Sequence, residues 1–207
     1  MEIKRASFVT SMDAYRAYPG IGLPEVAIAG KSNVGKSSLI NRLCRQNKLA
    51  KTSGTPGKTR LLNVFTLNEA LHLIDLPGYG FAKVNKAEKL RWASMLDGYF
   101  AQTGTLRRVL HLVDIRHDPT ADDRDMNGFL RATGFPFTVI ATKADKISRG
   151  ARMQHIAAIC RGLQVQPWEV LPWSSEDGTG REELLAILQA VLDEEEEARA
   201  QETPTFR

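Results

Sequence analysis

The run GKSNVGKS, residues 30–37, has the residue types and the spacing that can hold a polyphosphate. It matches the pattern GxxxxGK followed by Ser or Thr, and it stands between an apolar run and a helical pattern, the context in which this match is informative. Gly30 and Gly35 allow the backbone to wrap an anion with its N–H groups. Lys36 would neutralise the β- and γ-phosphates, and the Ser37 hydroxyl would bind Mg²⁺. We predict phosphate contacts along this loop from Gly30, Lys31, Ser32, Asn33, Val34, Gly35, Lys36, Ser37 and Ser38.

A carboxylate that could complete the magnesium shell begins the run DLPGYG, residues 75–80. Asp75 follows an apolar run, and enzymes with this phosphate loop need such a carboxylate at the end of a neighbouring strand, bound to Mg²⁺ directly or through water. The backbone N–H of Gly78 would reach the γ-phosphate, so the turn would sense whether that phosphate is present. The pattern therefore predicts Lys36 and Gly78 as catalytic groups, and Ser37 and Asp75 as Mg²⁺ ligands.

The run TKAD, residues 142–145, has the groups that would select guanine. The Asp145 carboxylate can accept hydrogen bonds from N1–H and the exocyclic amine of guanine, a donor pair that adenine lacks. The stem of Lys143 would lie along the base plane. In SSE, residues 174–176, Ser175 or a nearby backbone N–H could reach the guanine carbonyl oxygen. The predicted base-binding set is Thr142, Lys143, Asp145, Ser174, Ser175 and Glu176.

The stretch AKTSGTPGKTRLL, residues 50–62, is typical of a mobile loop because it is rich in Thr, Gly and Pro and flanked by cations. We expect Gly57 and Thr59 to contact the nucleotide. The Thr59 hydroxyl would complete the Mg²⁺ shell when the triphosphate is bound, so Thr59 is predicted as a catalytic residue together with Lys36 and Gly78. Thr55 is the alternative hydroxyl, and a plain basic surface loop is the other interpretation.

The composition is that of an ordinary globular protein, with 207 residues, 43% of them hydrophobic and 25% charged. We expect one domain over residues 1–198 and a frayed tail over 199–207. No apolar run reaches the roughly 18–20 residues of a membrane span, and no signal-peptide pattern is present. Cys44 and Cys160 lack a CxxC spacing and are expected to be buried thiols. These features favour a reducing, cytoplasmic compartment and no membrane association.

Positive charge is concentrated in the N-terminal third. Residues 1–62 hold 11 Lys and Arg against 3 Asp and Glu, whereas residues 121–207 hold 10 against 15. This asymmetry predicts an anionic partner beyond the nucleotide, although scattered solvated side chains would give the same counts. The candidate nucleic-acid contacts are Lys48, Lys51, Lys58, Arg60, Lys83, Lys86, Lys89 and Arg91.

Apolar runs alternate with helical patterns along the chain, which predicts a mostly parallel α/β sheet covered by helices on both faces. The expected strands are 25–30, 60–67, 70–76, 108–115, 137–143 and 168–174, and the expected helices are 36–46, 86–102, 121–132, 149–161 and 179–198. Asn68 and Glu69 lie at a hairpin turn, so one antiparallel edge strand is expected. The segment IKRASFV is a candidate for a further edge strand.

The ordered set GKSNVGKS, SGTPGKTR, DLPGYG, TKAD and SSE resembles the small GTPases of the TrmE–Era–EngA–EngB–septin group. Within that group, SGTPGKTRLLNVF and DLPGYGFAKV are similar to the EngB (YsxC/YihA) ribosome-assembly GTPases, and the resemblance covers about residues 5–195. It implies a Ras-like P-loop fold in a bacterial cytoplasmic protein that binds GTP and Mg²⁺. It also implies action in maturing the large ribosomal subunit, contact with its rRNA and proteins, and a link to cell division and septation. We expect a monomer.

Five positions bear on the rate of hydrolysis or depart from the general GTPase pattern. Thr142 stands where many GTPases have Asn, which leaves one bridging contact to the phosphate loop open, and Glu176 stands where Ala or Lys is common. Tyr79 stands where many have the Gln that orients water, so we expect slow intrinsic hydrolysis. Asn33 is a candidate K⁺ ligand, or an Asn that tolerates unusual backbone angles. Stimulation of GTP hydrolysis by ribosomal particles or K⁺ is therefore expected. Arg60 could reach the phosphates from within the same chain, but a surface arginine that faces RNA is the favoured interpretation.

Other functions remain open at this point. The chain could be a non-catalytic guanine-nucleotide-dependent binding module, an RNA-modification or membrane-associated GTPase, or an ATP-using kinase or transporter subunit; TKAD counts against the last. Trp92 could stack on a base, but its helical spacing favours a core position. His111 is expected to be a packed histidine rather than a general base.

Overall fold

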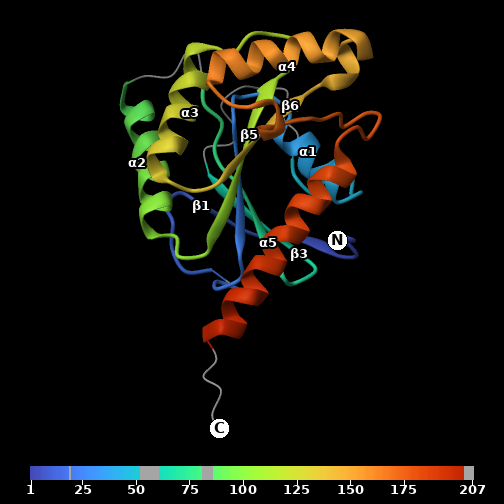
Figure 1. Ribbon diagram of the computed structural model, residues 1–207. Helices are drawn as coiled ribbons and strands as arrows, with labels where there is room; N and C mark the ends of the chain where they lie inside the picture. The colour runs from blue at the N-terminus through green and yellow to red at the C-terminus, as the bar shows by residue number, and fades with distance from the viewer. Residues whose placement is uncertain (19, 52–60, 81–85, 203–207) are drawn as a thin grey trace.

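The computed structural model describes residues 1–18, 20–51, 61–80 and 86–202 (Figure 1). Within these ranges the strands are β1 (Ala6–Met12), β2 (Glu25–Gly30), β3 (Leu62–Leu67), β4 (Leu71–Asp75), β5 (Leu106–Asp114), β6 (Phe137–Thr142) and β7 (Val170–Pro172). The α-helices are α1 (Lys36–Leu43), α2 (Lys86–Gln102), α3 (Ala121–Thr133), α4 (Arg149–Leu163) and α5 (Arg181–Glu202). Two short 3₁₀ turns, η1 (Ala144–Lys146) and η2 (Pro167–Glu169), complete the described elements.

The strands form one sheet in the order β1-β3-β4-β2-β5-β6-β7. Neighbouring strands from β4 to β7 pair in parallel, and β3 runs antiparallel to both β4 and β1. The predicted α/β fold and hairpin are therefore confirmed, and Asn68 and Glu69 take left-handed backbone angles at its turn. The antiparallel strand β3 is second from the edge rather than at it, because β1 pairs outside it.

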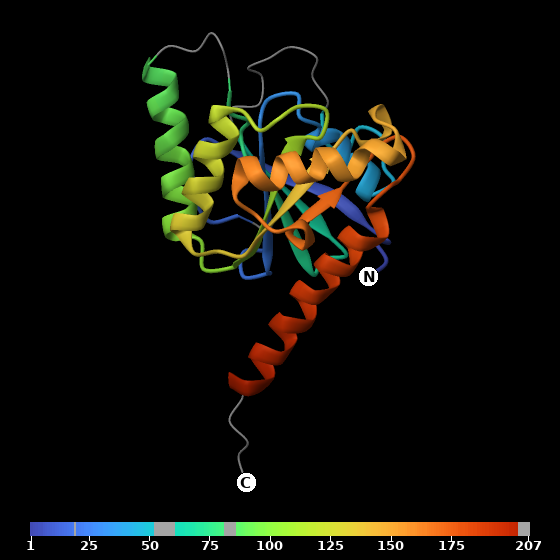
Figure 2. The same ribbon diagram turned by 45° about the horizontal axis from the view of Figure 1, so that its top comes forward.

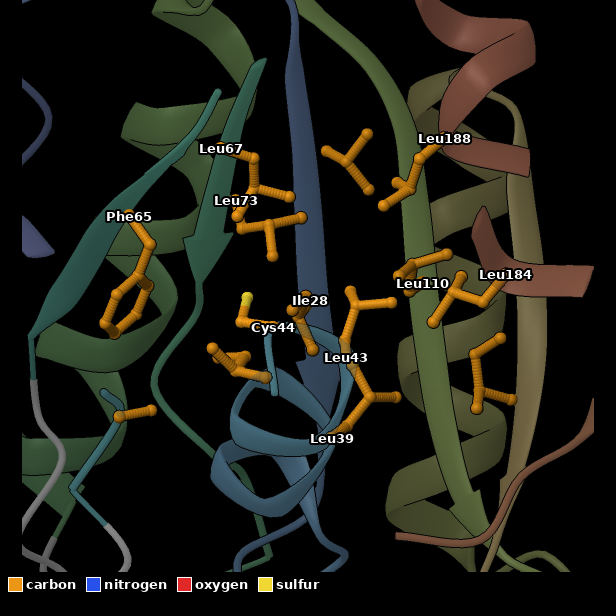
Figure 3. Packing of buried hydrophobic residues seen from close by; sticks show 14 of the residues in the cluster. Ile28, Leu39, Leu43, Cys44, Phe65, Leu67, Leu73, Leu110, Leu184 and Leu188 are labelled. Atoms are coloured by element: carbon orange, nitrogen blue, oxygen red, sulfur yellow. The ribbon is translucent and has the colours of Figure 1, made fainter. Parts of the chain in front are cut away.

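Helices cover both faces of the sheet. Successive side chains of β2 point to opposite faces, and all of them are buried, so each face packs against its own helices. Val26 and Ile28 pack in the core beneath α1 and α5, whereas Ala27 and Ala29 pack in the core beneath α2 and α3. Figure 3 shows the first of these cores, where Leu39 and Leu43 of α1 approach Ile28, and Leu184 and Leu188 of α5 approach Leu110. A third core lies between α4 and the β5–β6 strands. Cys44 and Cys160 are both buried, as expected.

The last helix runs to Glu202, four residues beyond its predicted end at 198, and its C-terminal end projects from the body of the domain (Figure 2). No helix in the described part of the chain is long and apolar enough to cross a membrane. The motifs identified in the sequence follow the carboxyl ends of β2, β4, β6 and β7. The carboxyl ends of these parallel strands lie on the same side of the sheet, and α/β folds bind ligands beside such strand ends.

Candidate functional site

The loop between β2 and α1 has the backbone shape of an anion cradle. Gly35 has φ 115° and precedes Lys36, the first residue of α1, and no side chain among the described residues caps that helix start. The N–H groups of its first turn are thus available to a ligand. Asn33 has φ 62°, which fits its interpretation as a residue that tolerates left-handed angles. A Cβ on Gly30 would lie 2.8 Å from Val34 Cγ1, so only glycine fits there.

The DLPG turn lies directly against this loop. A Cβ on Gly78 would lie 3.0 Å from Ser32 Oγ and 3.1 Å from Lys36 Nζ, so the backbone of the turn approaches both side chains closely. We call residues 30–38 together with 75–78 the phosphate corner. Its contacts join two segments that are about 40 residues apart in the sequence, as the two motifs together predicted.

Asp75 is buried at the end of β4 with an incomplete set of partners. Its Oδ2 lies 3.5 Å from Asn63 Nδ2, and its Oδ1 has no hydrogen-bond partner among the described residues. Burial raises the pKa of the carboxyl group, and the positive charge of Lys36 opposes that shift. A buried carboxylate oxygen without a partner suits a hard cation, which prefers oxygen ligands. The donor set of Asp75 and the Ser37 hydroxyl therefore fits Mg²⁺.

Tyr79 points into the core between the sheet, α2 and α3. Its side chain is buried, and its hydroxyl oxygen lies 2.8 Å from Asp123 Oδ1 and 2.9 Å from His111 Nε2. Burial lowers the pKa of His111 to about 4, so this residue is a packed neutral histidine, as expected. Trp92 is half-buried against the same core, and its Nε1–H donates to the Pro77 carbonyl at 3.0 Å. Its position favours the core interpretation over base stacking.

We call Thr142, Lys143, Asp145 and Ser174, with Asp114, the base corner. The Thr142 hydroxyl lies 2.8 Å from the Val34 carbonyl oxygen and 3.0 Å from that of Val113. Many GTPases have Asn at this position, and the sequence did not show whether a Thr could make the bridging contact to the phosphate loop. Thr142 makes that contact through its hydroxyl. Lys143 adds a second bridge, because its Nζ lies 3.0 Å from the Asn33 carbonyl oxygen and 2.9 Å from Asp114 Oδ2.

Asp145 is held in one orientation by its neighbours. Ser174 Oγ–H donates to Oδ1 at 2.8 Å, and Lys146 Nζ lies 3.0 Å from Oδ2. Although burial opposes it, these hydrogen bonds hold the pKa of Asp145 below its usual range, so the group is a carboxylate at neutral pH. Ser174 also accepts from the backbone N–H groups of Glu176 and Asp177. Ser175 instead accepts from Trp173 Nε1–H at 3.1 Å, and Glu176 contributes its backbone N–H.

Asp114 was not selected from the sequence, although it closes the base corner. It ends β5 and pairs with Arg116 at 2.7 Å as well as with Lys143. Burial alone would raise the pKa of Asp114, but hydrogen bonds from Arg116 and Lys143 hold that pKa far below its usual range. The sequence signal that could have identified Asp114 as a site residue was its position at the end of an apolar run. Asp75 and the TKAD run have the same position at the ends of their strands.

Several predicted residues lie outside the described ranges: Thr55, Gly57, Lys58, Thr59, Arg60 and Lys83. Of the predicted nucleic-acid contacts with described side chains, Lys48, Lys51, Lys89 and Arg91 are exposed. Lys31, Ser32, Ser37 and Ser38 are half-buried along the phosphate loop.

Sequence comparison with known proteins leads to GTPases and GTP-binding proteins, in agreement with the phosphate and base corners. Residues 25–143 match the model of a family described as 50S ribosome-binding GTPase. A "Probable GTP-binding protein EngB" of Desulfitobacterium hafniense is 44% identical over 196 residues, which cover 94% of this chain and 98% of that protein. The chain belongs to the EngB family. A second EngB, from an Exiguobacterium species, is 47% identical over 95% of this chain and 100% of its own length.

Solved structures place the EngB-family chain among P-loop GTPases. A crystal structure of an EngB protein superposes with a TM-score of 0.67 at 24% identity and covers 82% of this chain and 99% of that one, which supports the fold. A variant of Aquifex aeolicus Era bound to GDP·AlF₄⁻ superposes with a TM-score of 0.63 at 28% identity, over 83% of this chain and 56% of that one. The predicted P-loop fold and family are confirmed, and the protein is a GTP-binding GTPase.

Proposed function

We propose that this GTPase is a slow molecular switch that acts in assembly of the large ribosomal subunit. The observation that carries the proposal is the match of residues 25–143 to a family described as 50S ribosome-binding GTPase. Exposed Lys48, Lys51, Lys89 and Arg91 supply charges that suit an RNA partner. A related structure, that of Era, is described in complex with MgGDPNP and nucleotides 1506–1542 of 16S ribosomal RNA.

In this proposal the phosphate corner binds the phosphates of GTP or GDP. The N–H groups of residues 35–38, at the start of α1, and the Lys36 ammonium group neutralise the β- and γ-phosphates. Ser37 and Asp75, together with Thr59 outside the described ranges, would hold Mg²⁺, which offsets negative charge on the phosphate oxygens when it is bound. The backbone of Gly78 would contact the γ-phosphate. Asn33 is the proposed ligand of a K⁺ ion.

The base corner selects guanine. Asp145 accepts from the base, and the Lys143 stem lies along its plane while the ammonium group stays bonded to Asn33 and Asp114. Ser174 orients Asp145. We assign the contact to the guanine carbonyl oxygen to Ser175, through its backbone N–H or its hydroxyl. The N–H groups of Ser174 and Glu176 already donate to the Thr179 carbonyl and to Ser174 Oγ, whereas the Ser175 hydroxyl accepts from Trp173 Nε1–H and keeps its own proton to donate.

The position of Tyr79 supplies a physical reason for slow hydrolysis. Its hydroxyl is already bonded to Asp123 and His111 inside the core, so it is not placed to orient an attacking water. Charge neutralisation and positioning by Lys36, Thr59 and Gly78 would then supply most of the catalysis. We propose that ribosomal particles or K⁺ raise the rate, and that the protein acts as a cytoplasmic monomer during ribosome biogenesis and cell division.

Co-sedimentation with large-subunit particles tests the proposal. The protein is mixed with particles in GDP or in a non-hydrolysable GTP analogue, at two K⁺ concentrations. We expect the analogue form to pellet and GDP to release it. Reversing the charge at Lys89 and Arg91 should weaken pelleting about tenfold, because fewer phosphates are neutralised. Arg161→Glu on α4 is the control, since Arg161 is also exposed. Absence of binding in both nucleotide states would contradict the ribosomal role.

A further inference from the structure

The residue after the DLPG turn is tied to the phosphate loop by its backbone. Ser32 N–H donates to the Tyr79 carbonyl at 3.0 Å, and Tyr79 N–H donates to the Gly30 carbonyl at 3.4 Å. These bonds form an isolated parallel bridge between Lys31 and Tyr79, beyond the last paired residues of β2 and β4. The pairing of the two strands therefore resumes on the far side of Pro77 and Gly78.

The Tyr79 side chain has a fixed proton arrangement. Asp123 Oδ1 can only accept, so the single Tyr79 hydroxyl proton is donated to it. The contact with His111 at 2.9 Å then requires His111 Nε2 to carry a proton and donate to the hydroxyl oxygen. His111 Nδ1 is left as a buried lone pair without a partner in the described structure. Both hydrogen-bonding directions of the Tyr79 hydroxyl are thus occupied.

The acceptor Asp123 is itself rigid. Its Oδ2 accepts from the Thr120 N–H at 2.8 Å and from the Thr120 hydroxyl at 2.7 Å, which closes the capping box at the start of α3. Lys31 Nζ lies 3.4 Å from the same hydroxyl. Tyr79 is therefore joined to β5 through His111, to α3 through Asp123, and to the phosphate loop through its backbone.

Gly78 lies between two residues whose positions are fixed by hydrogen bonds, Pro77 and Tyr79. The Pro77 carbonyl accepts from Trp92 Nε1–H at 3.0 Å on one side, and Tyr79 is fixed in the core on the other. The peptide of Gly78 cannot rotate away from Lys36 unless one of these contacts breaks. A donor held in place before the reaction needs no reorganisation when charge develops on the phosphate.

We propose that Tyr79 is a positioning residue whose hydroxyl, bonded to Asp123 and His111, keeps the Gly78 peptide beside Lys36 in readiness for the γ-phosphate. This inference rests on the proposed role of Gly78 as the γ-phosphate contact. Because GDP lacks that phosphate, Tyr79 affects binding of the triphosphate and its hydrolysis, and leaves GDP binding unchanged.

The test compares Tyr79→Phe with Tyr99→Phe. Tyr99 is also fully buried and donates its hydroxyl to a carboxylate, Glu25 Oε2, at 2.7 Å, so both variants lose one buried hydroxyl. For Tyr79→Phe we expect single-turnover GTP hydrolysis and affinity for a non-hydrolysable GTP analogue each to fall about tenfold, the value of one hydrogen bond to a charged group. The dissociation constant for GDP should stay within about twofold of wild type. Tyr99→Phe should preserve all three quantities, even where its melting temperature falls as far.

Asp123→Asn provides a second variant if Tyr79→Phe folds poorly. The amide has one acceptor oxygen, which cannot serve both Tyr79 and the two Thr120 donors that the carboxylate now accepts. The same selective loss is therefore expected, and the double variant should be no worse than Tyr79→Phe alone. Equal losses for GDP and the analogue, or a Tyr79→Phe variant with wild-type hydrolysis, would overturn the inference. A wild-type protein that fails to distinguish the analogue from GDP would overturn the proposed switch as well, and the two failures are thereby distinguished.

Discussion

The base corner and the phosphate corner differ in how many of their polar groups already have protein partners. In the base corner, Asp145 is bonded to Ser174 and Lys146, and Lys143 is bonded to Asp114 and Asn33. In the phosphate corner, Asp75 Oδ1 is buried without a partner in the described structure, and the first turn of α1 has no side-chain cap there.

This difference indicates that folding builds the two corners to different degrees. The base corner satisfies its charged groups internally, so its geometry is set before the nucleotide binds. Among the described residues, the phosphate corner leaves a buried carboxylate oxygen and backbone N–H groups unpaired, which is costly unless a ligand completes them. We infer that nucleotide and Mg²⁺ complete the phosphate corner and meet a preformed base corner.

The largest effect is expected from Asp145→Asn, which would break the base corner. An amide cannot accept both guanine donors as a carboxylate does, and each such hydrogen bond contributes about 1.5–3 kcal/mol. GDP affinity, measured by titration with a fluorescent analogue, should fall at least about a hundredfold. Affinity for xanthosine diphosphate should rise relative to GDP.

Asp118→Asn is the matched control for that experiment, because Asp118 is exposed and has no hydrogen bond among the described residues. It should bind GDP as wild type does. An unchanged preference for guanine in Asp145→Asn would remove Asp145 from base selection.

The next effect is expected from Asp75→Asn in the phosphate corner. If Asp75 helps to hold Mg²⁺, wild-type affinity for GDP should be higher in Mg²⁺ than in a chelator, and the variant should lose most of that difference. We expect a loss of about tenfold in Mg²⁺ and little change in the chelator. A variant with an undiminished response to Mg²⁺ would contradict the assignment.

Thr142→Val removes one of the hydrogen bonds that connect the base corner to the phosphate corner. The variant lacks the hydroxyl that reaches the Val34 carbonyl oxygen, a loss of about 1 kcal/mol, so GDP affinity should fall about fivefold. Thr142→Asn should bind nearly as wild type, because its amide can donate to the same carbonyl. Thr138→Val, on the same strand and also buried, is the control and should leave GDP affinity unchanged.

The smallest effect is a pH dependence of stability that arises from Asp114. Because hydrogen bonds from Arg116 and Lys143 outweigh burial, its pKa is lower in the folded state than in the unfolded one. The resulting stabilisation is fully present above the unfolded pKa of about 4 and is lost as the pH falls toward the folded pKa. Wild-type free energy of unfolding, from urea titration without nucleotide, should therefore fall more steeply between about pH 5 and pH 3 than that of Asp114→Asn. Parallel curves would contradict this role.

The sequence predicted the elements and the site residues that belong to contiguous patterns. Continuous apolar runs and helical periodicity identified the strands and helices, and the runs 30–37, 75–78 and 142–145 follow the carboxyl ends of β2, β4 and β6. The partners Asp114 and Asp123 were not assigned to the site, because their contacts with Lys143 and Tyr79 join residues 29 and 44 positions apart. No local spacing specifies such a contact; it follows from the order of the strands.

Hydrogen–deuterium exchange on the nucleotide-free protein, with and without Mg²⁺–GDP, tests the difference between the corners most directly. Peptides that cover residues 142–147 and 173–178 should already be protected without nucleotide and should change little on binding. Peptides that cover 30–38 and 73–80 should gain protection of about tenfold or more, because the ligand completes their unpaired groups. Equal gains in both sets of peptides would contradict a preformed base corner.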